Sequence, residues 1–291
     1  MQKQTSFKQV NQTSGQLYLV PTPIGHLDDM TYRAVSILNQ VDMILAEDTR
    51  RTIKLLNHFD IQTSMQSFHD HTQDIRIDNI VSLLLEGQSF AVVSDAGMPL
   101  INDPGHPLVQ KALDHSVSVI ALPGANAALT ALVASGLPAN TFTYYGFFPR
   151  SNKEQKKVLQ AVGNREETAI FYESPYRVSR AINAIVSTLG EEVKVVIARE
   201  LTKQYEEYLR GTAQEIFAYL KDYTLKGECV LLIQGGILED LDEIDTEVSL
   251  KEQVEQLIED GLKPNQAIKQ VAQRNQMRRQ AVYQAYHELN K

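Results

Sequence analysis

Short apolar segments rich in β-branched residues alternate with amphipathic segments in the first half of the chain, and this alternation restricts the fold most. It predicts strands over 15–20, 42–47, 89–95 and 117–122. Apolar residues at three- and four-residue intervals predict helices over 31–40, 50–58, 74–86 and 106–115. Strands that alternate with helices form βαβ units, so we expect a largely parallel sheet with helices on both faces.

A second series of this kind follows a small-residue helix predicted over 124–136. Its strands are predicted over 141–146, 167–173, 192–200, 204–211 and 227–236, and its helices over 153–163, 175–189 and 213–222. The connection from 192–200 to 204–211 is too short for a helical crossover, so this pair is expected to be antiparallel. The chain is therefore predicted to be an α/β protein with two mixed α/β domains.

The composition changes after Gly236. A stretch of acids without a basic residue predicts a solvated linker: Glu239, Asp240, Asp242, Glu243, Asp245 and Glu247. Beyond it, three short amphipathic segments predict a small helical, helix-turn-helix-like module. The expected division is a flexible segment 1–14, α/β domains 15–138 and 139–237, a linker 238–247 and a helical module 248–291.

Composition excludes several classes of protein. The single cysteine, Cys229, cannot form an intramolecular disulfide or a cysteine-based zinc site and fits a reducing cytosol. The polar beginning of the chain does not resemble a signal peptide, and no apolar run is long enough to cross a membrane, so a cytoplasmic location is expected. The formal net charge of −8 argues against a generic polyanion binder.

Three turns rich in glycine and proline follow predicted strands, at 21–26, 94–105 and 122–128. Open α/β sheets bind ligands at the carboxyl ends of their strands, and backbone of this kind can approach a ligand closely. Asp95 adds a carboxylate that can accept from a ribose hydroxyl or an amine, or that can close an Asx turn. No GxGxxG or GxxxxGK[ST] pattern occurs, which disfavours dinucleotide and nucleoside-triphosphate sites.

The segment AEDTRRT (46–52) places Glu47 and Asp48 beside Arg50 and Arg51 at a strand end that opens a helix. Capping of the helix explains Asp48, and such carboxylates can also deprotonate an alcohol. His69 and His71 lie two residues apart, but no third ligand has suitable spacing, so no metal site is expected.

Aromatic and basic residues end the strands of the second series, in the segments GFFPR (146–150), FYESPYR (171–177) and ARELTK (198–203). Aromatic rings beside guanidinium groups suit stacking on a base or an adenine ring. Packing between domains is an equally good explanation for Phe147 and Phe148.

A series of short motifs resembles the bacterial small-subunit ribosomal RNA methyltransferases of the tetrapyrrole methylase superfamily. In chain order, the motifs are PTPIG, AEDTR, SDAGMPLINDPG, LPG, GF-x-P, FYES, ARELTK and KGE. Those enzymes methylate the ribose 2′-oxygen of a cytidine in 16S-type RNA. The resemblance covers residues 15–236 and implies a two-domain fold, S-adenosylmethionine in the cleft between the domains, and a homodimer. His26 and Met98 depart from the usual Asn and Thr, so only a main-chain contact is expected of Met98.

The resemblance also implies roles for individual residues. The cofactor is expected against Pro23, Asp95, Ala96, Gly97, Met98, Ile101, Asn126, Ala127 and Tyr172. Glu47 and Asp48 are the candidate bases for the ribose hydroxyl. The candidates for RNA contact are Arg50, His69, His71, Arg177, Arg199 and Lys203.

Local charge is compatible with an RNA partner despite the acidic total. Residues 150–165 carry Arg150, Lys153, Lys156, Lys157 and Arg165 against Glu154 alone. The end of the chain is similarly basic over 264–291. A small-molecule, tetrapyrrole-like methylase and a DNA-binding regulator remain as alternatives. The basic surface disfavours a tetrapyrrole-like methylase. A DNA-binding regulator is disfavoured because it leaves the large α/β region without a role.

Overall fold

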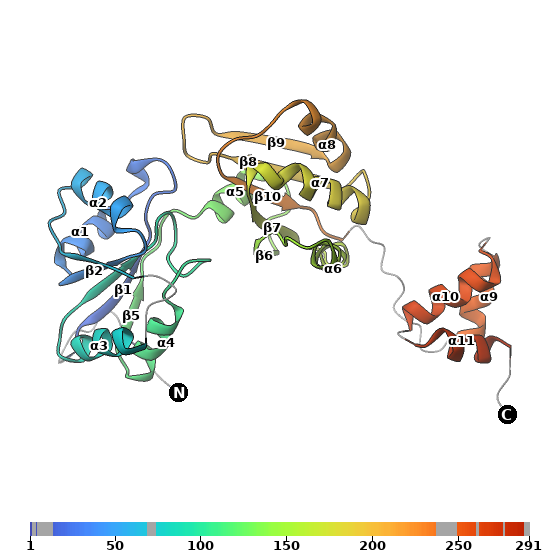
Figure 1. Ribbon diagram of the computed structural model, residues 1–291, viewed down its shortest axis with the longest axis horizontal. Coiled ribbons are helices and arrows are strands. Elements are labelled where there is room, and N and C mark those ends of the chain that lie inside the picture. Colours follow the sequence, from blue (N-terminus) through green and yellow to red (C-terminus); the bar gives the residue numbers. More distant parts are fainter. Residues whose placement is uncertain are drawn as a thin grey trace. The chain divides into compact units, whose positions relative to one another are not determined.

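The computed structural model describes residues 1, 4, 14–68, 74–236, 249–259, 262–275 and 277–287. The chain divides into two compact units, 1–235 and 236–291. The first unit holds two five-stranded sheets (Figure 1). The predicted linker 238–247 and most of the predicted segment 1–14 lie outside the described residues.

The first sheet is entirely parallel. It consists of β1 (Gln16–Val20), β2 (Met43–Ala46), β3 (Met65–Ser67), β4 (Phe90–Val93) and β5 (Ser118–Ala121), in the order β3-β2-β4-β1-β5. The βαβ pattern is thus confirmed. The pattern missed only β3, whose three residues are too few to show an alternation.

Helices cover both faces of this sheet (Figure 1). Helices α1 (Tyr32–Gln40) and α2 (Thr49–His58) pack on one face, and α3 (Asp74–Leu85) and α4 (His106–Asp114) pack on the other. Adjacent strand residues point to opposite faces, so Ile44 belongs to the first core and Leu45 to the second. Both side chains are fully buried, which explains why these strands are apolar without interruption.

The second sheet is mixed. It consists of β6 (Phe142–Phe147), β7 (Thr168–Glu173), β8 (Lys194–Arg199), β9 (Glu207–Thr212) and β10 (Cys229–Ile233), in the order β6-β7-β10-β8-β9. Only β6 and β7 are parallel, and the other pairs are antiparallel. The predicted antiparallel pairing of β8 with β9 is confirmed.

The second sheet also has a helix from the first strand–helix series on one face. Helix α5 (Ala127–Ser135) packs on β7, β8 and β10 through Ala131 and Leu132. On the opposite side lie α6 (Asn152–Gly163), α7 (Pro175–Leu189) and α8 (Ala213–Asp222), which pack in series. There the buried Phe148 ring contacts Phe171 edge-on at 5.2 Å.

The second unit is a small helical module. Helices α9 (Leu250–Glu259), α10 (Pro264–Arg274) and α11 (Arg279–Tyr286) surround the buried Val254, Val271 and Val282. In the part of the chain that the structure describes, no helix combines the length and apolar character needed to span a bilayer.

Candidate active site

The strand order brings the three glycine- and proline-rich turns together. Strands β4, β1 and β5 are neighbours in the sheet and parallel, so the turns after them leave one edge side by side. Thr22 and Gly97 exchange backbone hydrogen bonds of 3.0 and 2.9 Å. A Cβ on Gly124 would lie 2.6 Å from Pro21 Cβ, so only glycine allows this approach of the third turn.

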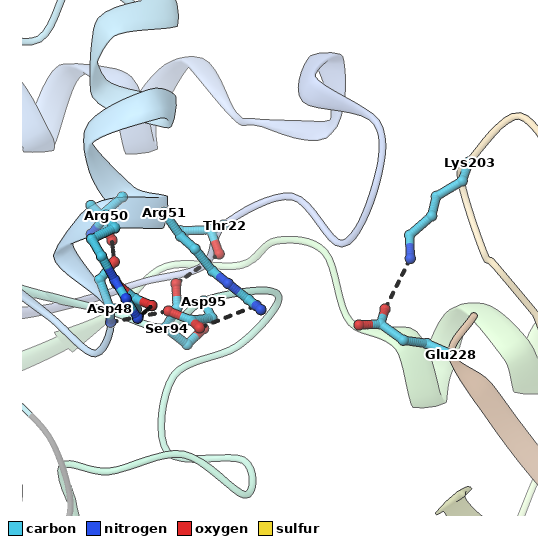
Figure 2. A network of polar contacts seen from close by, with 9 residues as sticks. Thr22, Asp48, Arg50, Arg51, Ser94, Asp95, Lys203 and Glu228 are labelled. Carbon is cyan, nitrogen blue, oxygen red and sulfur yellow. Dashed lines mark hydrogen bonds and ion pairs between the residues drawn. The ribbon is translucent and has the colours of Figure 1, made fainter. Parts of the chain in front are cut away.

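Asp95 joins two of the strand ends at this edge (Figure 2). Its Oδ1 accepts a 3.1 Å hydrogen bond from the backbone N–H of Asp48, and its Oδ2 lies 3.2 Å from Nη1 of Arg51. Because β2 is the neighbour of β4, the start of α2 lies beside the loop that carries Asp95. A carboxylate has about four acceptor positions, so Asp95 retains acceptor capacity for a ligand.

A pocket of about 1310 Å³ opens beside Asp95, within the first unit. Its lining comes from the turns of the first sheet and from β6, β7, α7 and β10 of the second. All the predicted cofactor residues except Pro23 line it: Asp95, Ala96, Gly97, Met98, Ile101, Asn126, Ala127 and Tyr172. Pro23 lines an adjoining pocket of about 410 Å³.

The chemistry of this lining fits S-adenosylmethionine, which combines an apolar adenine with ribose hydroxyls and an amino-acid end. Met98, Ile101 and Ala127 supply apolar surface, and Asp95 and Asn126 supply polar groups. Gly97 contributes to the pocket wall through its backbone conformation. Its φ is +85°, and an added Cβ would lie 3.3 Å from Ile24 Cγ2, so a larger residue here would crowd the turn.

One tyrosine of the second sheet connects to the long loop after β4, and a second tyrosine packs against the first. The Tyr144 hydroxyl donates to Asn102 Oδ1, and the Tyr144 and Tyr172 rings meet edge-on at 5.1 Å. Burial raises the pKa of both phenols above their ordinary value, so both stay neutral in the physiological range. Asn102 is held at a φ of +66°, and its link to Tyr144 ties the loop to the second sheet.

The two candidate bases occupy different surroundings. Glu47 lines the pocket. Asp48 is the N-cap of α2 and accepts from the backbone N–H, Nε and Nη2 of Arg50 at 2.9, 3.0 and 2.8 Å. These hydrogen bonds lower the pKa of Asp48 to about 2, which makes its carboxylate a weak base.

The described candidates for RNA contact are all paired with carboxylates. Their ion pairs are Arg50 with Asp48 at 2.8 Å, Arg177 with Glu173 at 2.6 Å, Arg199 with Glu207 at 2.9 Å, and Lys203 with Glu200 and Glu228 at 2.9 and 3.0 Å. Of these, Arg177 lines the large pocket and Lys203 the adjoining one. His69 and His71 lie outside the described residues.

The residues assigned to the cofactor, the base and the RNA did not include several that line the pocket, among them Arg51, Asn102, Phe147, Arg150 and Arg180. Signals for some of them were present, because Arg51 lies in AEDTRRT, and Phe147 and Arg150 lie in GFFPR. The two phenylalanines of GFFPR differ, since Phe148 is buried and the Phe147 side chain is 59% exposed. Packing explains Phe148 but not Phe147.

The site and fold together place this chain among known methyltransferases. The family model of the Tetrapyrrole (Corrin/Porphyrin) Methylases matches residues 16–216. The chain therefore belongs to this family, as its sequence resemblance implied, and its methyl donor is S-adenosylmethionine.

Two proteins that match this chain over nearly its full length have a more specific name than the family. The chain is 50% identical over 289 residues to Ribosomal RNA small subunit methyltransferase I of Streptococcus pyogenes serotype M3, covering 99% of this chain and 100% of that protein. It is 44% identical over 276 residues to the protein of that name from Bacillus subtilis, with 94% of each chain covered. These similarities include the helical module at the end of the chain.

Solved structures share the fold at much lower identity. Uroporphyrin-III-C-methyltransferase from Thermus thermophilus aligns with a TM-score of 0.53 at 16% identity, over 77% of this chain and 96% of that one. Diphthine synthase aligns with a TM-score of 0.60 at 11% identity, over 76% of this chain and 90% of that one. These likenesses establish the tetrapyrrole-methylase fold of the first unit.

Proposed function

We propose that this protein transfers a methyl group to the ribose 2′-oxygen of a cytidine in 16S-type ribosomal RNA of the small subunit. The observation that carries the proposal is the full-length similarity to rRNA small subunit methyltransferases, combined with a pocket whose lining matches the predicted cofactor residues. The pocket volume of about 1310 Å³ exceeds the roughly 300–1,000 Å³ usual for one small ligand, which leaves room for a nucleotide beside the cofactor.

In this proposal, Asp95, Asn126 and the backbone of 96–98 hold the polar parts of S-adenosylmethionine. Met98, Ile101, Ala127 and Tyr172 enclose its adenine. The bound cofactor supplies an activated methyl group on a positively charged sulfur. The protein's contribution is to hold the acceptor hydroxyl in line and to exclude water, and such positioning can account for a large part of the acceleration.

Glu47 is the proposed acceptor for the proton of the ribose hydroxyl. A protonated ribose hydroxyl is a poor nucleophile, and a nearby carboxylate assists its deprotonation. Glu47 is among the lining residues of the pocket and Asp48 is not, and hydrogen bonds from Arg50 lower the pKa of Asp48 to about 2. We assign Asp48 the role of holding the start of α2 next to Asp95.

We also propose that the protein acts as a homodimer in the cytoplasm. Leu129 and Val133 lie one turn apart on α5, on the side away from the second sheet, and their side chains are 46% and 78% exposed. Exposed apolar residues on one helical face favour a protein contact. Equilibrium sedimentation tests this, and a monomer at micromolar concentration would contradict it.

The test of the function is transfer of a radiolabelled methyl group to small ribosomal subunits lacking the modification, followed by nucleotide mapping. We expect one labelled cytidine with the methyl group on its 2′-oxygen. Label on a base, or on a uroporphyrin-type ring with subunits unlabelled, would contradict the proposal. A mobility-shift assay with duplex DNA tests the regulator alternative.

A further inference from the structure

The pocket lining contains two arginines that were not among the predicted RNA residues. Arg150 and Arg180, here called the pocket arginines, line it from the second sheet's side. Nη2 of Arg180 donates a 2.6 Å hydrogen bond to Oδ1 of Asn152, two residues after Arg150, so the two arginines come from adjacent segments. Both side chains belong to exposed residues, so their guanidinium groups are accessible from solvent.

The pocket arginines differ electrostatically from the other cations near the site. Arg51, Arg177 and Lys203 are each held by a carboxylate at 2.6–3.2 Å. Within the described residues, neither pocket arginine forms an ion pair with a carboxylate. Their charge therefore remains available for an anionic ligand, whereas binding of an anion by the paired cations must compete with an existing partner.

Helix α6 continues this positive charge along the surface. Lys153, Lys156 and Lys157, here called the α6 lysines, are all exposed. Their spacing of three and four residues puts them on one face of the helix, which begins two residues after Arg150. The single acid among them, Glu154, accepts from the hydroxyl of the N-cap Ser151 at 2.7 Å, so it serves the helix end.

An exposed aromatic ring lines the same pocket. Phe147 is the last residue of β6, its side chain is 59% exposed, and its ring approaches Tyr172 edge-on at 6.0 Å. A phenylalanine left this exposed in a pocket wall suits stacking on a base. The pocket thus joins a stacking ring to arginines that form no ion pair within the described residues, and these are the two elements of single-stranded RNA binding sites.

We propose that the pocket arginines and the α6 lysines bind the phosphates of the single-stranded rRNA segment that carries the target nucleotide, and that Phe147 stacks on one of its bases. This inference rests on the proposed function. It assigns RNA contact to residues other than the ion-paired Arg50, Arg177, Arg199 and Lys203. Phosphate contacts position the strand, and the stacked base holds the target ribose at the pocket.

The experiment compares wild type with the double variant Arg150→Gln/Arg180→Gln in methyl transfer to small subunits. We expect the KM for subunits to rise about tenfold per arginine, with kcat at saturating subunits nearly unchanged. The slope of log affinity against log salt concentration should become shallower by about 1 to 1.5, because each phosphate contact on a single strand contributes about 0.7. Calorimetric S-adenosylmethionine binding and the melting temperature should be unchanged.

A matched control variant also removes two positive charges, but at positions outside both pockets. Arg33→Gln/Lys221→Gln alters exposed cations on α1 and α8 that line neither pocket, and it should keep the wild-type KM and salt slope. For the stacking ring, Phe147→Leu should raise the KM for subunits about tenfold. Phe142→Leu, which changes another exposed ring on the same strand, should not.

The outcomes separate this inference from the function on which it rests. A wild-type KM and salt slope in the double variant, with wild type active on subunits, would overturn the inference and leave the function standing. A loss of S-adenosylmethionine binding in the double variant would also overturn it, because the arginines would then serve the cofactor. Wild type that methylates a carboxylate-rich tetrapyrrole and not subunits would overturn both.

Discussion

The Arg51 guanidinium lies 3.2 Å from the Asp95 carboxylate, and this ion pair joins helix α2 to the loop after β4. Together with the hydrogen bond from the Asp48 backbone, it fixes the carboxylate at the edge of the pocket. The carboxylate is oriented before any ligand binds, so less side-chain entropy is lost on binding. Asp95 is therefore the residue on which cofactor affinity is expected to depend most.

Asp95→Ala should weaken S-adenosylmethionine binding by about 10- to 100-fold, the effect of losing a hydrogen bond to a charged group. Isothermal titration calorimetry measures this directly. Asp114→Ala, at the end of α4, removes an exposed carboxylate that is not among the lining residues of either pocket and should bind like wild type. Unchanged binding by the Asp95 variant would remove this residue from the site.

Glu47→Gln should bind S-adenosylmethionine normally and slow methyl transfer by about 100-fold or more, because the amide cannot accept the proton of the ribose hydroxyl. Single-turnover measurements with saturating subunits report this step. Asp48→Asn should affect the rate much less. A wild-type rate in the Glu47 variant, or a larger loss in the Asp48 variant, would reverse the assignment of the base.

Asp48→Asn should instead change how stability depends on pH. The Arg50 hydrogen bonds lower the pKa of Asp48 from 3.8 to about 2. Above about pH 4 the Asp48 carboxyl is ionised in both the unfolded and the folded chain, so the hydrogen bonds contribute their full stabilisation of the folded state there. This stabilisation disappears as the pH falls through about 2. Asn still caps a helix, so the variant isolates the charge. The difference in melting temperature should be largest at neutral pH and shrink between pH 4 and 2, and a constant difference would contradict this.

Arg177→Ala should lower the free energy of unfolding by about 3 kcal/mol, because it leaves the Glu173 carboxylate without its charged partner. The Glu173 side chain is 2% exposed, and Arg177 contacts it through Nε at 2.8 Å and Nη2 at 2.6 Å. Urea unfolding measures the loss. Adding Glu173→Gln should restore part of it, and a stable single variant would show that the pair contributes little.

Gly124→Ala should destabilise the fold by about 1–3 kcal/mol, the usual cost of overpacking. The added methyl group would lie 2.6 Å from Pro21 Cβ and 2.9 Å from its Cγ. Pro21→Gly removes both atoms, so the double variant should lose less stability than the two single changes predict by addition. If the stability losses of the two single variants simply add up in the double variant, measured by thermal unfolding, the destabilisation by Gly124→Ala does not come from a clash with Pro21.

Much of the fold could be predicted from the sequence because its determinants are local. A few residues of local sequence are enough to identify an apolar strand such as β4 or β5 and an amphipathic helix such as α1 or α7. The three turns of the candidate cofactor site were likewise recognisable from their glycines and prolines. The three-residue β3 escaped because a segment so short carries no period.

The ion pairs could not be predicted in this way. Arg199 pairs with Glu207 across two strands, and Arg51 pairs with Asp95 across two neighbouring strand ends. Local sequence shows that a cation is present but not which carboxylate the fold brings to it. The described residues first chosen for RNA contact are paired with carboxylates. Arg150 was noticed in the sequence only as part of GFFPR and of a basic stretch, and the structure brought it into the pocket lining together with Arg180.

The sequence by itself thus determined most of the elements, the turns of the candidate cofactor site and the family, because each depends on residues that are neighbours in the chain. The tertiary structure decided the strand order β3-β2-β4-β1-β5, which sets the three turns side by side. It also decided which positive charges are neutralised, since Coulomb interactions depend on distance in space and not along the chain.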